Sequence, residues 1–394
     1  MQRINFQIFK HFFKSEKIGG VILLFCVILS LIIANSALGQ PFENLLKKEL
    51  GFESSGIQLL YPIALWINDG LMAIFFLLVG LEIKREMLEG ELSSPKRAAM
   101  PIFAALGGML VPALIYAFFN DGLRTADGWG IPMATDIAFA LAIISMLGKK
   151  IPSSLKIFLA ALAIVDDLGA IMIIALFYTK ELHLDQLLYA GGIFVFLILL
   201  NYFGVKKLVF YIIPGIFLWY FVHHSGIHAT IAGVLLAFTI PTNPVKEISP
   251  LEKLEHGLVS PVNYLIMPLF ALANTNIRFE STMIDGLYSP LGIGIIAGLF
   301  LGKPIGITIF AWISVKLRFS TLPSRSTWKH IIGVGFLAGI GFTMSLFISL
   351  LSFSNPELTA EAKFSILTGS VISGITGFFI LKSLRKYSRK LKPA

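Results

Sequence analysis

Residues 157–177 read IFLAALAIVDDLGAIMIIALF, an apolar run with two adjacent acids, Asp166 and Asp167, near its middle. The run is long enough to cross a bilayer as a helix, which takes about 20 residues. A charge at the centre of a bilayer costs about 2.5–3.5 kcal/mol on insertion scales, so an acid in this position marks a functional site. The stretch therefore predicts a membrane protein whose function depends on buried carboxylates.

The composition of the whole chain indicates the same class of protein. Of its 394 residues, 56% are hydrophobic and 14% are charged, and the mean hydropathy is +0.81. Soluble domains carry about 25% charged residues, so we expect an all-α integral membrane protein in which residues 1–394 form one polytopic domain. The sequence contains no recognisable nucleotide-binding glycine loop or soluble catalytic domain. These features predict a transporter driven by an ion gradient, not an enzyme, with no cofactor.

Twelve apolar segments divide the chain, although eleven helices remain an alternative because the eighth and ninth segments are short. The first is longer than a signal-peptide core of about 7–15 residues, so we interpret it as a retained helix. The segments are 18–38, 60–82, 98–119, 131–148, 153–178, 184–203, 208–223, 225–240, 258–274, 288–315, 329–352 and 361–381.

The basic residues predict the orientation of these segments. The net charge of +9 would suggest a nucleic-acid partner in a soluble protein, but 25 of the 32 lysines and arginines fall in alternate connections. Such an excess in short loops marks the cytoplasmic side. We therefore expect both termini in the cytoplasm, membrane lipid as the surrounding partner and no nucleic acid. The largest outside loop, residues 39–58, is either a solvated connection or a homodimer contact.

The adjacent acids Asp166 and Asp167 have different predicted tasks. Neighbouring residues on a helix point about 100° apart, so one acid can face an ion path while the other faces a neighbouring helix. Lys303 lies near the middle of the tenth segment, and a buried lysine needs a carboxylate partner. Asp166 or Asp167 is the available partner, and a purely structural ion pair is the alternative interpretation.

Two segments carry signs of a helix break. Pro132 and Gly130 precede Thr135-Asp136 in the fourth, where freed carbonyls and the hydroxyl suit sodium or lithium. A simple helix N-cap at the membrane surface is the alternative for that pair. In the eleventh, residues 333–345 contain four glycines, which also fit close helix packing. The two breaks lie in the middle of segments 3–5 and 10–12, which cross the bilayer in opposite senses. Paired interruptions in an inverted repeat indicate the binding site of a transporter.

Several motifs resemble the bacterial NhaA sodium/proton antiporters, and the similarity extends from about Phe12 to the basic C-terminal tail. The matching runs are FFLLVGLEIKRE (75–86), ATDIAFA (134–140), AIVDDLGA (163–170), GIHATIAG (226–233), GKP (302–304) and GIGFTMS (339–345).

The resemblance implies a fold and an activity. It implies twelve helices, with helices 4 and 11 unwound and crossed at mid-membrane and a core of helices 3–5 and 10–12, in the bacterial inner membrane. The activity would be electrogenic, pH-regulated export of sodium or lithium in exchange for incoming protons. Residue by residue, the ion- and proton-binding positions fall on Asp166, Asp167, Asp136, Thr135 and Lys303, and the positions linked to pH regulation on Glu82, Arg85, Glu86, Glu255, His256 and His228.

The sequence departs from the family near Glu255. Many members carry a second histidine shortly after the Glu-His pair, whereas this chain has Val259 there. The departure concerns pH regulation only. His228 also fits a packed polar residue without a functional role.

Three rivals belong to other classes. A cation channel would use polar rings around a pore, and a sodium-coupled symporter would carry an organic substrate. An intramembrane aspartyl protease would use Asp136 with Asp167, but it would leave Lys303 unexplained and its usual Gly-x-Gly-Asp motif is absent.

Overall fold

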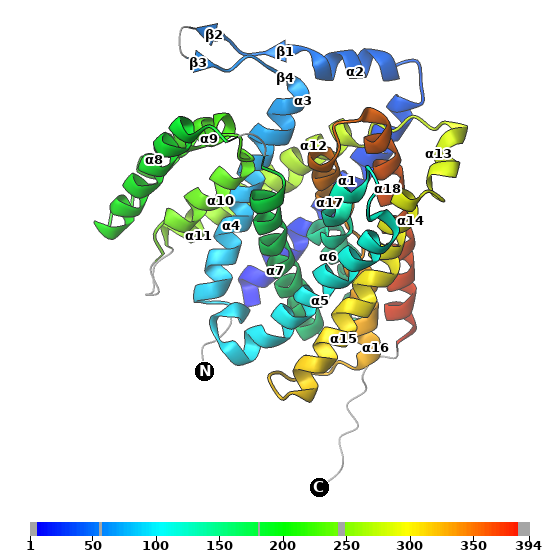
Figure 1. The fold of residues 1–394 in the computed structure, drawn as a ribbon. Helices are drawn as coiled ribbons and strands as arrows, with labels where there is room; N and C mark the ends of the chain where they lie inside the picture. Colours follow the sequence, from blue (N-terminus) through cyan, green and yellow to red (C-terminus); the bar gives the residue numbers. More distant parts are fainter. Residues whose placement is uncertain (1–5, 55–56, 180–181, 243–248, 385–394) are drawn as a thin grey trace. The chain divides into compact units, whose positions relative to one another are not determined.

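The fold is described from a computed structural model, which covers residues 6–54, 57–179, 182–242 and 249–384. Most of these residues are helical (Figure 1). The chain divides into two compact units. The first consists of Met1–Ile18, Ser94–Asp167 and Thr282–Ala394, and the second of Gly19–Ser93 and Leu168–Ser281. The first unit thus contains the third, fourth, tenth, eleventh and twelfth predicted segments and the beginning of the fifth.

The first unit combines long continuous helices with others that are interrupted near their middles. One boundary with the second unit falls inside α7, directly after Asp167. The elements are α5 (Pro95–Asn120), η3 (Ala126–Met133), α6 (Ile137–Met146), η4 (Gly148–Lys150), α7 (Ser153–Phe177), α13 (Ser281–Gly286), α14 (Pro290–Ala297), η6 (Gly298–Gly302), α15 (Lys303–Lys316), α16 (Trp328–Ala338), α17 (Phe342–Ser352) and α18 (Pro356–Ser383).

Glycines bring α5 and α15 into backbone contact. A Cβ added to Gly107 would lie 2.2 Å from the carbonyl oxygen of Gly306, and one added to Gly306 would lie 2.0 Å from that of Gly107. Small residues at helix interfaces allow this close approach in membranes, where dispersion forces replace the hydrophobic effect as the main driving force. The contact fixes the part of α15 that follows Lys303.

In its described residues, the second unit contains the remaining helices and four short strands. Its elements are α1 (Phe6–Ala34, shared with the first unit up to Ile18), α2 (Gly39–Lys47), β1 (Glu49–Leu50), β2 (Glu53–Ser54), β3 (Ile57–Gln58), β4 (Tyr61–Pro62), α3 (Ile63–Leu65), η1 (Trp66–Leu71), α4 (Met72–Leu88), η2 (Glu91–Ser93), α8 (Leu184–Tyr202), α9 (Val209–His224), α10 (Thr230–Thr239), α11 (Pro250–Pro261), η5 (Val262–Ile266) and α12 (Met267–Asn274).

The fold is mostly helical, as predicted, and the short strands are an addition to it. The antiparallel pairs β1–β4 and β2–β3 lie in and beside the stretch expected to be a loop, residues 39–58, which also contains α2. The backbone between two membrane helices satisfies its own polar groups by pairing. Gly51 at the centre of this segment has φ +124°, a conformation that suits glycine.

By length and composition, eight helices in the described part of the chain could cross a membrane. Two bent pairs raise the number to ten if each is one span: Ile18–Ala34 with Gly39–Lys47, and Trp328–Ala338 with Phe342–Ser352. Two further apolar helices, Val209–His224 and Thr230–Thr239, are shorter. The chain is therefore a multi-pass membrane protein, and the number twelve stays a prediction.

Two helices begin well before their apolar segments. α11 starts at Pro250 instead of residue 258, because Ser249 and Glu252 form a capping box: the Ser249 hydroxyl accepts from the Glu252 N–H and the Glu252 carboxylate from the Ser249 N–H. α18 starts at Pro356, before the predicted twelfth segment, 361–381. Polar first turns lower the local hydropathy and hide such helix starts from a hydropathy pattern.

Candidate functional site

The two acids of α7 are buried among apolar residues. Asp166 is 1% exposed and Asp167 is 2% exposed. The Asp166 carboxylate accepts a hydrogen bond from the Thr135 hydroxyl at 2.6 Å and pairs with the Lys303 ammonium. Asp167 is next along the helix, so its side chain points in another direction. The different tasks of the two acids stay a prediction.

Lys303 lies where a π-helical turn ends. η6 (Gly298–Gly302) leads into α15, and Pro304 follows the lysine without an N–H to donate. Such π turns within α-helices occur frequently at functional sites. The ammonium has no exposed surface and donates to Asp166 and, at 2.9 Å, to the Thr135 hydroxyl oxygen. A buried ammonium requires such partners, and Asp166 is thus the direct carboxylate partner that the sequence left undecided.

The fourth predicted segment is interrupted at Thr135 and Asp136. The 3-10 helix η3 ends at Met133, Ala134 to Asp136 are not helical, and α6 begins at Ile137. Asp136 is the N-cap of α6, because its Oδ1 accepts a hydrogen bond from the Phe139 N–H at 3.1 Å. The N-cap interpretation is therefore correct for this residue, but the cap is only 1% exposed.

The eleventh predicted segment is interrupted at Gly339 to Gly341, where α16 and α17 meet at an angle of 46°. The glycines also permit close packing. A Cβ on Gly339 would lie 2.3 Å from the carbonyl oxygen of Leu299, and one on Gly341 would lie 3.0 Å from that of Ala134. The glycine-rich run therefore both interrupts the helix and permits close packing.

Hydrogen bonds join the two interruptions. The Thr135 hydroxyl lies 2.9 Å from the carbonyl oxygen of Ala338, and the Asp136 N–H donates to that of Ile340 at 2.6 Å. Asp136 Oδ2 accepts from the hydroxyl of Thr343 at 2.6 Å and from its N–H at 3.0 Å. Irregular backbone at membrane depth is tolerated when it is buried in protein. Here each break satisfies polar groups of the other.

The residues expected to regulate the pH response lie in the second unit. Arg85 on α4 donates from Nε to both carboxylate oxygens of Glu255 on α11, at 3.0 and 2.9 Å, and from a terminal nitrogen to Glu86 at 2.8 Å. Glu82 is 9% exposed, one turn before Glu86 on the same helix. These four residues form a largely buried charge cluster, and its link to pH regulation stays a prediction.

The two histidines expected to take part in pH regulation lie outside this charge cluster. His256 follows Glu255 but is exposed to solvent, because neighbouring positions on α11 face different ways. His228 is half-buried in the turn before α10.

Two polar contacts of the structure were not predicted. Thr343 lies in the run GIGFTMS (339–345), and nothing in that run indicates the partner of its hydroxyl. Asp69 lies in a helix expected to span the membrane, 3.5 Å from His223 Nδ1, and its carbonyl accepts from the Trp219 indole at 3.1 Å. An acid inside an apolar segment was the signal that would have identified Asp69.

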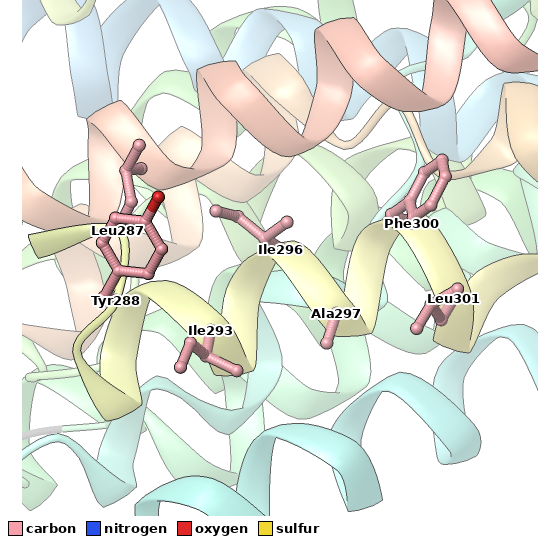
Figure 2. Close-up of a pocket in the computed structure, with 7 residues that line it drawn as sticks. All are labelled: Leu287, Tyr288, Ile293, Ile296, Ala297, Phe300 and Leu301. Carbon is pink, nitrogen blue, oxygen red and sulfur yellow. The ribbon is translucent and has the colours of Figure 1, made fainter. Parts of the chain in front are cut away.

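An apolar pocket of about 370 Å³ lies in the first unit (Figure 2). Its lining side chains come from α14, η6 and the turn before α14, and the only side-chain polar atom among them is the Tyr288 hydroxyl. They are Leu287, Tyr288, Ile293, Ile296, Ala297, Phe300 and Leu301. Without carboxylates this pocket lacks the charge that a cation site needs, so the candidate site remains the buried network of Asp166, Lys303 and Thr135.

The described residues thus define a multi-helix membrane protein with a buried acid–lysine centre between two interrupted helices. Residues 10–381 match the family model of Na+/H+ antiporter 1, and the chain belongs to this family.

Two relatives and one solved structure show how far the similarity extends. "Na(+)/H(+) antiporter NhaA 2" of Flavobacterium johnsoniae is 63% identical over 384 residues, covering 97% of this chain and 94% of the relative. "Na(+)/H(+) antiporter NhaA" of Flavobacterium psychrophilum is 52% identical, covering 96% and 97%. The solved structure of the sodium proton antiporter MjNhaP1 from Methanocaldococcus jannaschii has a TM-score of 0.52 and 13% identity over 96% of both chains, a similarity in fold.

Proposed function

We propose that this chain is an electrogenic, pH-regulated secondary antiporter that exports cytoplasmic sodium or lithium in exchange for incoming protons. The observation that carries the proposal is the buried network of Asp166, Lys303 and Thr135 at the two interrupted helices. Family membership and the names of the relatives support sodium and protons as the exchanged ions.

The chemistry rests on competition for the carboxylates. Sodium and lithium prefer hard oxygen ligands, and an ionised carboxylate binds either a cation or a proton. Burial disfavours an uncompensated charge. A site that has lost its cation is therefore stabilised when its carboxylates take up protons. If the site opens to one side of the membrane at a time, occupancy by either ligand permits the return step.

Lys303 accounts for the unequal numbers of cations and protons that are exchanged. The lysine pairs with Asp166 when no cation is bound, and a cation that takes over Asp166 leaves the ammonium without its partner. The ammonium then releases a proton, as does Asp167 when it ionises to bind the same cation. One monovalent cation thereby displaces more than one proton, so each cycle moves net charge.

The finer architecture is part of the proposal. We place twelve spans in a bacterial inner membrane, with both termini in the cytoplasm and the fourth and eleventh spans crossing at their interruptions. The first unit is the transport core and the second its scaffold. The segment 39–58, with its short strands, is the proposed homodimer contact.

The charge cluster of Glu82, Arg85, Glu86 and Glu255 is the proposed pH gate. Protonation of its acids would weaken the pairing with Arg85 and shift a conformational equilibrium. His256, next to Glu255 on α11, is a further candidate for regulation. His228 is the remaining candidate for regulation.

Sodium addition to everted membrane vesicles that hold an imposed proton gradient tests the function. We expect sodium and lithium, but not potassium, to collapse the gradient at alkaline pH, and vesicles without the protein to retain it. No response at any pH from neutral to alkaline contradicts the proposal. Sodium flux insensitive to the proton gradient would indicate a channel, and sodium-dependent uptake of an organic solute would indicate a symporter.

A further inference from the structure

The Asp136 carboxylate is held by the first turns of two different helices. Its Oδ1 accepts from the Phe139 N–H of α6 at 3.1 Å, and its Oδ2 accepts from the N–H and the hydroxyl of Thr343 in α17. Asp136 and Thr343 are each 1% exposed. Among the described residues, the Thr343 hydroxyl is the side-chain donor that meets this carboxylate, at 2.6 Å.

The start of α17 depends on this contact. Its N-cap position is Gly341, which has no side chain to accept from the first N–H groups of the helix. The Asp136 carboxylate accepts from the Thr343 N–H instead, so the cap comes from another segment of the chain. A carboxylate at a helix N-terminus is favoured by the helix dipole.

The same contact determines the position of the neighbouring Thr135. The Asp136 N–H donates to the Ile340 carbonyl, and the Asp136 carboxylate accepts from Thr343. Both the backbone and the side chain of Asp136 are therefore bound to the eleventh segment. Thr135 precedes it across one planar peptide bond, and the Thr135 hydroxyl is the group that meets Asp166 and Lys303.

We propose that Thr343 is a positioning residue for cation binding: its hydroxyl holds the Asp136 carboxylate, and through Asp136 it holds Thr135 against Asp166. The inference rests on the proposed exchange of sodium for protons. Thr343 does not touch the cation. It sets the geometry of the oxygen ligands on the interrupted fourth segment.

Removal of the hydroxyl tests this role. Thr343→Val keeps the shape of the side chain, and Thr343→Ala removes the hydroxyl without the risk of overpacking, whereas Thr343→Ser keeps the donor. In liposomes containing the purified protein, we expect both hydroxyl-free variants to raise the apparent KM for sodium about 3- to 10-fold, the range that loss of one typical hydrogen bond predicts. The maximal rate should stay within about twofold of wild type, because the reacting groups are intact, and Thr343→Ser should restore the KM.

Ser349→Ala is the matched control. Ser349 is a buried residue of the same helix, but its hydroxyl donates to the Leu346 carbonyl within α17. We expect this variant to keep the wild-type KM.

Each other outcome is decisive. An unchanged KM in Thr343→Val and Thr343→Ala, or a Thr343→Ser variant as weak as Thr343→Val, overturns the positioning role. An equal rise in Ser349→Ala overturns it too, as does failure of both hydroxyl-free variants to fold while Thr343→Ser folds, because the hydroxyl would then be structural. A wild-type protein without sodium-driven proton flux contradicts the proposed function itself.

Discussion

We expect Asp166→Asn and Asp167→Asn each to reduce sodium-driven proton flux to the background of protein-free liposomes, while the protein still inserts and folds. Asparagine preserves the size and shape of the side chain but carries neither the negative charge nor the exchangeable proton of a carboxyl group. Both acids are buried, and Asp166 is the carboxylate that meets Lys303 and Thr135. The measurement is proton flux after sodium addition, with the amount of folded protein determined by size-exclusion chromatography.

Asp185→Asn is the control for this pair. Asp185 lies exposed in the first turn of α8, so the same chemical change there should leave transport unchanged. Near-normal flux in Asp166→Asn or Asp167→Asn would move the cation site to other residues.

The second large effect concerns stability. Lys303→Ala leaves the Asp166 carboxylate buried without its cationic partner, and loss of one partner of a buried ion pair costs about 3–5 kcal/mol. Lys303→Arg and Lys303→His retain a group that can be positively charged, so these two variants should lose less stability. Thermal unfolding in detergent, followed for all three variants, measures the difference.

Lys316→Ala provides the comparison on the same helix. Lys316 is exposed, with its ammonium 4.5 Å from the centre of the Trp312 ring. Such an exposed cation–π contact is worth about 0.5–1 kcal/mol, so this variant should lose far less stability than Lys303→Ala. Equal stability of the three Lys303 variants would contradict the acid–lysine pair, whatever their transport activity.

The sequence predicted the chemical partners better than their geometry. A lysine inside an apolar span required a carboxylate, and the acidic pair was the available partner. Which of the two acids meets Lys303 depends on how α7 is rotated about its own axis. That rotation is set by packing against other helices and cannot be predicted from the local sequence. The same holds for His256, which the sequence placed beside Glu255 and the fold leaves exposed.

Composition and local motifs predicted both interrupted segments. Pro132 and the glycines of residues 333–345 disfavour a continuous helix, and the chain is not helical at Ala134–Asp136 and is interrupted at Gly339–Gly341. The link from Asp136 to Thr343 joins residues 207 positions apart. A side-chain contact over such a separation is a property of the tertiary fold, so the sequence did not predict it.

Hydropathy was a poor guide to the ends of the helices. It placed the start of the ninth span at residue 258, although the capping box of Ser249 and Glu252 starts the helix at Pro250. It also gave no sign of the strands around Gly51, which form because backbone groups between helices pair with one another.

The most direct test of the central claim, that sodium and protons compete for the buried acids, is the rate of exchange at saturating sodium on both sides of neutral pH. Competition predicts the same maximal rate at acidic and alkaline pH, with only the apparent KM for sodium rising as pH falls, by about tenfold per pH unit for each competing proton. With Val259 in place of a second histidine, we expect this behaviour to account for most of the pH profile. A maximal rate that collapses below neutral pH despite saturating sodium would contradict it. Control would then lie with a conformational gate, and variants of Glu255 or His256 would shift the profile.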